Sequence, residues 1–243
     1  MPSLPDMIFA RCQAAGISLD SKAAEKLASF HMLLMEWNQR MDLTAVLEEN
    51  EMIDRHYIDS LSPLLVANMI PTGSVIIDVG SGAGFPGLPL AIARPDVEMT
   101  LLDAQQKRVN FLQEAIRKLN LTNTRAIHGR SENTAHEAGH REKYDLALAR
   151  AVASLPTLLE LLLPFLRPGG YAVCWKGPSV LSEITAGQKA AKLLGGTLNE
   201  AIETPIPGRD WSHLLVPCLK TEKTLRHYPR KAGTPGRMPL GRE

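Results

Sequence analysis

An acidic residue and three alternating glycines end a run of apolar β-branched residues in the first third of the chain. The run Val75–Val79 contains Asp78, and the glycines are Gly80, Gly82 and Gly84. A short apolar run of this kind predicts a buried strand. The glycines permit a tight turn and let backbone N–H groups come close to a ligand. Together these residues predict a site for a nucleotide-like cofactor.

Two cofactor templates fit this stretch. Gly82–Gly87 is a GxGxxG sequence, and Asp103 follows about 20 residues later, as in a dinucleotide site. The overlapping stretch Asp78–Gly84 has the pattern acid-x-Gly-x-Gly-x-Gly. In this pattern it resembles the class I S-adenosylmethionine methyltransferases. Asp78 would attract the sulfonium and amino group of that ligand but would oppose a pyrophosphate. We therefore favour the methyl donor, and an NAD-dependent oxidoreductase is the alternative.

These residues need a fold that brings strand ends together. From Val75 onward, expected strands and helices alternate, which predicts a doubly wound, mostly parallel Rossmann-like α/β sheet with helices on both faces. The segments around 197–204 and 213–224 predict an antiparallel pair, and Pro168-Gly169-Gly170 predicts a turn. The expected strands are Val75–Val79, Val97–Asp103, Thr124–His128, Asp145–Ala149 and Tyr171–Trp175, and the expected helices are Gln106–Leu119, Leu155–Leu166 and Val180–Leu194.

Helices are expected before the sheet. A stripe from Ala23 to Met41 recurs at steps of three and four residues, with Asp20 or Ser21 placed to cap it. A second helical stretch covers Glu48–Met69, where Ser62-Pro63 can restart the helix. We expect three parts: a helical N-terminal segment (1–70), a methyltransferase domain (71–224) and a basic C-terminal tail (225–243).

The composition is that of an ordinary globular protein. The chain has 243 residues, of which 44% are hydrophobic, and a net charge of +1. Its three scattered cysteines, Cys12, Cys174 and Cys218, have no CxxC spacing, so neither a disulfide framework nor a zinc site is expected. No signal-peptide pattern occurs, and the apolar stretch Leu155–Leu166 is too short to span a bilayer. We expect a cytoplasmic monomer without membrane contact.

The charge is concentrated at one end of the chain. Residues 220–243 hold seven Lys or Arg and two acids, a net charge of +5, which leaves −4 for the rest. A basic end on a nearly neutral protein predicts a polyanionic partner. A solvated tail that only promotes solubility is the alternative.

Several longer motifs identify the chain as similar to one family. Two prolines stand in the glycine turn, and the other motifs follow in order from about Trp37 to the C-terminus. The chain resembles the bacterial RsmG (GidB) family, whose members methylate N7 of a guanosine in 16S ribosomal RNA. Asp42 and Ala104 depart from the Asn and Ser that are usual there. The motifs are Asp54–Leu61, Gly80–Leu90, Leu102-Asp103 with Lys107-Arg108, Ala149–Ala153 and Tyr228–Pro235.

The resemblance implies roles for single residues. Gly80 and Phe85 would line the cofactor, while Gly82 and Gly84 keep the backbone close to it. Asp103, with Ala104 beside it, would hold the ribose. Two further positions, Ser131 and Glu132, would lie by the adenine. Arg150 ends a strand, so it would face the cofactor and serve as the catalytic residue.

The chemistry agrees with this substrate. Guanine N7 lies on the major-groove edge and is an unprotonated lone pair at neutral pH. Displacement on the sulfonium methyl then needs alignment and no strong general base. The sequence accordingly lacks an Asn-Pro-Pro-Tyr-like motif, and Cys174 lies in an apolar strand, not in a nucleophile turn. A non-enzymatic RNA-binding protein is a further alternative.

Basic residues predict the contacts with 16S ribosomal RNA, either free or in a small-subunit assembly particle. Tyr228 stands among the cations of the tail, where it could stack on a base. Arg55 and His56 could instead belong to a buried network around Asp59. The expected RNA contacts are Arg55, His56, Lys176, Arg226, Arg230 and Lys231.

One motif points elsewhere. The stretch from His136 to His140 is a literal HExxH, the signature of zinc proteases. It lies in a short charged segment between strands and contains Gly139, which does not suit the stable helix that such a site needs. We expect a loop and no metal.

Overall fold

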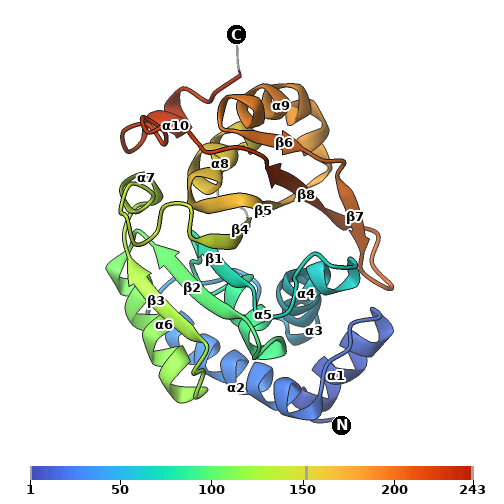
Figure 1. Ribbon diagram of the computed structural model, residues 1–243. Helices are drawn as coiled ribbons and strands as arrows, with labels where there is room; N and C mark the ends of the chain where they lie inside the picture. Colours follow the sequence, from blue (N-terminus) through green and yellow to red (C-terminus); the bar gives the residue numbers. More distant parts are fainter. Residues whose placement is uncertain (1, 151–152, 242–243) are drawn as a thin grey trace.

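Eight strands form one sheet at the centre of the molecule (Figure 1). The computed structural model describes residues 2–150 and 153–241, so Ala151 and Val152 of the family motif lie outside the described residues. The order is β3-β2-β1-β4-β5-β8-β6, and β7 also pairs with β8. The strands are β1 (Val75–Val79), β2 (Glu98–Asp103), β3 (Thr124–His128), β4 (Tyr144–Arg150), β5 (Leu166–Lys176), β6 (Gly196–Leu198), β7 (Ile202–Pro205) and β8 (Ser212–Lys220).

Strand directions confirm the predicted fold class. Strands β1 to β5 are parallel, whereas β8 is antiparallel to β5, β6 and β7. The chain therefore brings the carboxyl ends of β1, β2 and β4 to one edge of the sheet, where open α/β sheets bind ligands. The helices are α1 (Leu4–Ala14), α2 (Ser21–Asn38), α3 (Glu49–Met52), α4 (Asp59–Leu61), α5 (Gly87–Ala93), α6 (Gln106–Lys118), α7 (Ser131–Thr134), α8 (Leu155–Leu162), α9 (Ile184–Leu193) and α10 (Thr234–Arg237).

Each face of the sheet has its own apolar core. Side chains alternate along a strand, so Ile76 of β1 belongs to one core and Ile77 to the other. The first core includes residues of α1, α2, α5 and α6, and the second includes residues of α8 and α9 (Figure 1). The N-terminal helices reach the sheet through other helices, since α2 packs on α5 and α6 and α1 packs on α2. The capping of α2 by Asp20 is confirmed.

The predicted helix Glu48–Met69 is broken into short segments. Between α3 and α4 the chain forms a π-helical turn, Ile53–Ile58, and a 3-10 helix, Ser62–Leu65, begins next to Pro63. π-helical turns are rare and occur frequently at functional sites. This one carries Arg55 and His56. The local sequence shows the helical content but not this change of pitch.

The predicted turn Pro168-Gly169-Gly170 lies inside β5. That strand begins at Leu166, and its register against β4 shifts between Tyr144 and Leu146. A Cβ at Gly170 would lie 2.6 Å from the carbonyl oxygen of Asp145, so the two backbones approach closely here. The glycines therefore make an irregularity within the strand pair.

The C-terminal segment is folded against the body. Arg141 donates hydrogen bonds to the carbonyl oxygens of Thr224 and Tyr228, at 2.8 and 2.9 Å, and Thr157 of α8 bonds the carbonyl oxygen of Pro235. The division into three parts stays a prediction. Within the described ranges, every helix is too short or too polar to cross a membrane.

Candidate active site

The glycine turn joins the ends of β1 and β2. The N–H groups of Gly80 and Ser81 donate to the carbonyl oxygen of Leu102, at 2.8 and 3.2 Å. Gly80 and Gly82 have φ of 76° and 57°, in the left-handed region that glycine adopts without strain. The N–H of Gly82 donates to Oδ2 of Asp103 at 2.9 Å. The predicted turn and the predicted strand-end acid therefore form one unit.

Asp103 is held in a fixed orientation. Its Oδ1 accepts the N–H of Gln105 at 2.8 Å, and its side chain is only 4% exposed. Arg108 approaches Oδ2 at 3.8 Å from the first turn of α6. Each carboxylate oxygen has two lone-pair sites, so these bonds leave acceptor capacity free. Asp103 can therefore accept hydroxyl donors from a ligand.

A cavity of about 500 Å³ opens between the glycine turn and Asp103. We call it the cofactor cavity. Sequence reasoning did not assign Leu43, Ser81, Ala83, Gln105 or Arg108 to it. Besides those five, its lining consists of Gly80, Gly82, Phe85, Asp103, Ala104, His56 and Arg150.

Two residues of the glycine motif lie outside the lining of the cofactor cavity. Asp78 is fully buried and outside the cofactor cavity, and its Oδ2 accepts the N–H of Gly87 at 3.1 Å. This carboxyl group therefore braces the turn from behind. The predicted attraction between Asp78 and the cofactor stays a prediction. Gly84 faces α5, where a Cβ would lie 2.5 Å from Cδ1 of Leu88.

The position of Asp78 also affects its ionisation. Burial raises the pKa of Asp78 to about 7, although the hydrogen bond from Gly87 acts in the opposite direction. Oδ1 of Asp78 has no hydrogen-bond partner among the described residues. A cation in the neighbouring cavity would favour the ionised form of this carboxyl group.

The side chains of Ser131 and Glu132 also lie outside the cofactor cavity. The hydroxyl group of Ser131 donates to the carbonyl oxygen of Leu161 at 2.7 Å. Oε1 of Glu132 accepts the N–H of Gly233 at 2.8 Å. These side chains connect α7 to α8 and to the C-terminal segment. The contact of this turn with the adenine stays a prediction.

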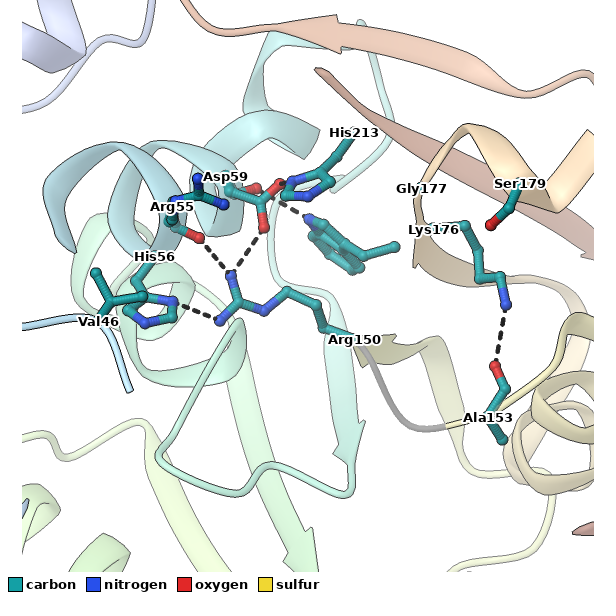
Figure 2. Close-up of a pocket in the computed structure, with 11 residues that line it drawn as sticks. Val46, Arg55, His56, Asp59, Arg150, Ala153, Lys176, Gly177, Ser179 and His213 are labelled. Carbon is teal, nitrogen blue, oxygen red and sulfur yellow. Dashed lines mark hydrogen bonds and ion pairs between the residues drawn. The ribbon is translucent and has the colours of Figure 1, made fainter. Parts of the chain in front are cut away.

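Arg150 ends β4 and lies between two cavities. Its Nη1 donates to Oδ2 of Asp59 at 2.8 Å and to the carbonyl oxygen of Arg55 at 3.0 Å, and its Nη2 donates to Nδ1 of His56 at 3.0 Å (Figure 2). The guanidinium also lies over the ring of Phe85, 5.1 Å from its centroid. Arg150 has five N–H donors, and the three bonds to described residues leave donors for a ligand.

His56 is a neutral partner of Arg150. Since a guanidinium only donates, Nδ1 of His56 is the acceptor, and the proton lies on Nε2, which bonds Thr44 Oγ1 at 2.9 Å. Burial, and next the charge of Arg150, lower the pKa of His56 to about 4. The ring stacks on Phe85 with centroids 4.6 Å apart. The contacts of His56 are therefore those of a buried network that joins the helical segment to the sheet, which was the alternative to an RNA contact.

A second cavity, of about 380 Å³, lies on the other side of Arg150 (Figure 2). We call it the outer cavity. It shares His56 and Arg150 with the cofactor cavity. Lys176, a predicted RNA contact, also lines it, and its Nζ is paired with Glu183 at 3.0 Å. The remaining lining residues are Val46, Arg55, Asp59, Ala153, Trp175, Gly177, Ser179 and His213.

Sequence reasoning missed the partner of Asp59. Nδ1 of His213, on β8, donates to Oδ1 of Asp59 at 2.7 Å. The indole N–H of Trp175 donates to the Asp59 carbonyl oxygen at 2.9 Å. Asp59 itself was expected in a network, because it lies one helical turn from Arg55 and His56. The sequence around His213 gives no such signal.

The basic C-terminal segment is only partly available to RNA. Arg230 donates through Nη2 to Oε2 of Glu160 at 2.6 Å, and the Glu160 side chain is 0% exposed. Arg230 therefore has a structural role here, and its contact with RNA stays a prediction. Arg226 and Lys231 are exposed, and they follow strand β8 on the outside of the molecule.

The HExxH residues have other partners. Nε2 of His136 bonds the carbonyl oxygen of Pro229 at 2.9 Å, and Nδ1 of His140 bonds the hydroxyl group of Tyr144 at 2.7 Å. In the part of the chain that the structure describes, no three metal-binding side chains come together.

The fold and site define a class I methyltransferase: a doubly wound sheet, a glycine turn after β1, and an acid at the end of β2 beside an open cavity. The family model described as rRNA small subunit methyltransferase G matches residues 23–204. The chain belongs to this family. It is accordingly an S-adenosylmethionine-dependent rRNA methyltransferase, and the NAD-dependent alternative is not favoured.

Curated relatives agree over nearly the whole length. The ribosomal RNA small subunit methyltransferase G of Alkaliphilus metalliredigens is 43% identical over 94% of this chain and 95% of its own. The protein of the same name from a Clostridium botulinum type A strain is 41% identical over 97% of this chain and 98% of its own.

Solved structures support the fold alone. The Methanococcus jannaschii fibrillarin pre-rRNA processing protein aligns with a TM-score of 0.51 and 17% identity, over 67% of this chain and 74% of its own. A mutant of the 16S rRNA (adenine(1408)-N(1))-methyltransferase from Catenulisporales acidiphilia aligns with a TM-score of 0.51 and 14% identity, over 63% of this chain and 88% of its own.

Proposed function

We propose that the protein transfers a methyl group from S-adenosylmethionine to N7 of a guanosine in 16S ribosomal RNA. The observation that carries this proposal is the meeting of two cavities at Arg150 and His56. One cavity has the residues of a cofactor site, and the other opens towards cationic side chains. A cofactor and a base could thus approach each other across this boundary.

The residues of the cofactor cavity fit S-adenosylmethionine. Asp103 offers acceptors for ribose hydroxyls, and Phe85 offers an apolar ring. Gly80 and Gly82 present backbone without side chains, and Ala104 follows the ribose-binding acid. The unpartnered Oδ1 of buried Asp78 adds negative potential behind the turn, which suits a cation. When bound, this ligand supplies a methyl group on a positively charged sulfur.

The reaction requires no proton transfer. The lone pair of guanine N7 forms the bond to the methyl carbon while the bond from that carbon to sulfur breaks, and its electron pair stays on sulfur. The positive charge thus moves to the guanine. A neutral His56 adds no charge that would oppose this change, and Asp59 balances the charge of Arg150. The main task of these residues is alignment.

The outer cavity is the proposed place of the target guanine. Arginine and lysine donate to guanine O6, which lies next to N7 on the same edge. Arg150 has free donors at the boundary, and Lys176 lies further into the outer cavity. With O6 held in this way, N7 points towards the cofactor cavity and stays free to react.

The wider RNA contacts belong to the same proposal. Arg55 lies at the outer cavity with its guanidinium 4.7 Å from the Trp211 ring centroid, and Arg226 and Lys231 are exposed. These cations suit phosphates. We propose a cytoplasmic monomer that acts on the small-subunit rRNA, free or within an assembly particle.

The experiment supplies radiolabelled S-adenosylmethionine with 16S rRNA, and separately with small subunits, both from cells that lack this methylation. We expect label at one guanosine, in a position that chemical cleavage at N7-methylguanine reveals. Label on another atom, or no label on either substrate, would contradict the proposal. The ratio of the two rates identifies the preferred substrate.

A further inference from the structure

Arg150 is held from behind by two residues that do not touch the cofactor cavity. Asp59, at the start of α4, accepts a hydrogen bond from Arg150 and another from His213 on β8. The Asp59 side chain is 1% exposed, and its two oxygens each have one of these partners. Figure 2 shows Asp59 between the other two side chains. Three segments far apart in sequence thus form one chain of contacts.

We propose that His213 is a positioning residue for methyl transfer, which acts through Asp59 on the guanidinium of Arg150. This inference rests on the proposed function. His213 bonds Oδ1 of Asp59, so it fixes the rotation of the carboxylate, and Oδ2 then points at Nη1 of Arg150. The carbonyl oxygens of Arg55 and Asp59 add further fixed points, because they accept from Arg150 and Trp175.

A buried carboxylate needs its partners to stay in one place. A lost hydrogen-bond donor leaves Oδ1 of Asp59 unpaired, which is costly for a charged group. The carboxylate can then turn towards water in the outer cavity. Arg150 would lose its orientation at the boundary between the two cavities, although it keeps its bond to His56. Small misplacements of this kind lower the rate of transfer more than binding.

The positions of these residues predict a separation of effects. His213 lines the outer cavity but not the cofactor cavity. Arg150 does line the cofactor cavity, but it keeps its bonds to His56 and to the Arg55 carbonyl oxygen when His213 is removed. The affinity for S-adenosylmethionine should therefore change little. Methyl transfer to RNA should fall in kcat, since Arg150 no longer holds the base in line.

The test compares His213→Ala with His213→Asn in the full chain. The Asn side chain can still donate an N–H to Asp59, so we expect it to restore the activity that Ala loses. We expect His213→Ala to lower kcat at least about tenfold and His213→Asn to lie within about threefold of the wild type. The dissociation constant for S-adenosylmethionine, measured by calorimetry, should stay within about twofold of the wild-type value.

A matched control and a double variant make the test specific. His140→Ala removes the hydrogen bond between His140 and Tyr144, which is as long, at 2.7 Å, as the bond between His213 and Asp59. Tyr144 begins β4, whereas Arg150 ends it, so this variant should leave kcat unchanged. In an Arg150→Ala background, His213→Ala should have no further effect, because residues that act as a unit are not additive. Unfolding curves show that each variant is folded.

The outcomes are distinguishable. If the wild type does not methylate the RNA, the proposed function fails. If the wild type is active and His213→Ala equals it, or if the losses from His213→Ala and Arg150→Ala add, then this inference is overturned. An additive result would mean that His213 and Arg150 act independently.

Discussion

Nη2 of Arg150 donates a hydrogen bond to Nδ1 of His56, at 3.0 Å. This contact requires an unprotonated Nδ1, and it joins the residue that ends β4 to the π-helical turn before the sheet. The stack of His56 on Phe85 extends the same contact to the glycine turn. The wall between the two cavities is therefore built from three separate parts of the chain.

The first prediction concerns the pH dependence of stability. The pKa of His56 is lowered from its usual 6.5 in an unfolded chain to about 4 in the folded state, so the unfolded state binds more protons between these limits. Stability should therefore fall as the pH is lowered through this window, and it should be fully present above it. A shift of this size corresponds to roughly 3 kcal/mol. His56→Gln should lose less stability than the wild type between pH 7 and pH 4.5 in urea denaturation. Equal losses would contradict the prediction.

Asp103 should determine cofactor affinity. Asp103→Asn keeps an acceptor for one backbone N–H but loses the charged acceptor that faces the cavity. We expect the dissociation constant for S-adenosylmethionine to rise about 10- to 100-fold, as for lost hydrogen bonds to a charged group. Calorimetry measures it. Glu114→Gln is the control and should bind as the wild type does, because Glu114 lies on α6 outside the cofactor cavity. Wild-type affinity in Asp103→Asn would exclude Asp103 from the site.

Two glycines of the turn should respond differently to alanine. A Cβ at Gly84 would lie 2.5 Å from Cδ1 of Leu88, whereas a Cβ at Gly82 would meet only the carbonyl oxygen of Gly80, at 3.8 Å. Both positions have positive φ, so each substitution carries a similar backbone cost of about 1 kcal/mol. Overpacking adds about 1–3 kcal/mol for Gly84→Ala alone. Its Tm should be clearly lower than that of Gly82→Ala. Gly82→Ala should mainly weaken cofactor binding, because its Cβ enters the cofactor cavity.

Substitutions in the C-terminal segment should affect either folding or RNA binding, depending on the residue that is changed. Arg230→Ala leaves the buried Glu160 without its cation, so we expect a loss of about 3 kcal/mol in unfolding free energy and faster proteolysis after residue 224. Arg226→Ala and Lys231→Ala change exposed side chains, so their unfolding free energy should stay within about 0.5 kcal/mol of the wild type. These two variants should weaken RNA binding, with a reduced dependence on salt. If RNA affinity is unchanged in both, the segment does not contact the RNA.

Much of the sheet could be predicted because its signals are local. The strand Thr124–His128 has the predicted bounds, and helix α6 ends within one residue of the expected position. Apolar runs, glycines and helix caps act over a few residues, so they are readable without a structure. The position of Asp103 at a strand end was sufficient to place it beside the glycine turn.

The sequence by itself determined the fold class, the glycine turn, the acid at the end of the next strand, and the family. Only the tertiary structure decided which polar groups pair. Asp59 and His213 are 154 residues apart, and Arg230 and Glu160 are 70 apart. It also decided that Asp78 lies behind the turn and that Arg150 is held between two cavities. Such pairs depend on how helices pack on a finished sheet, whereas periodicity and turn chemistry report only on neighbours along the chain.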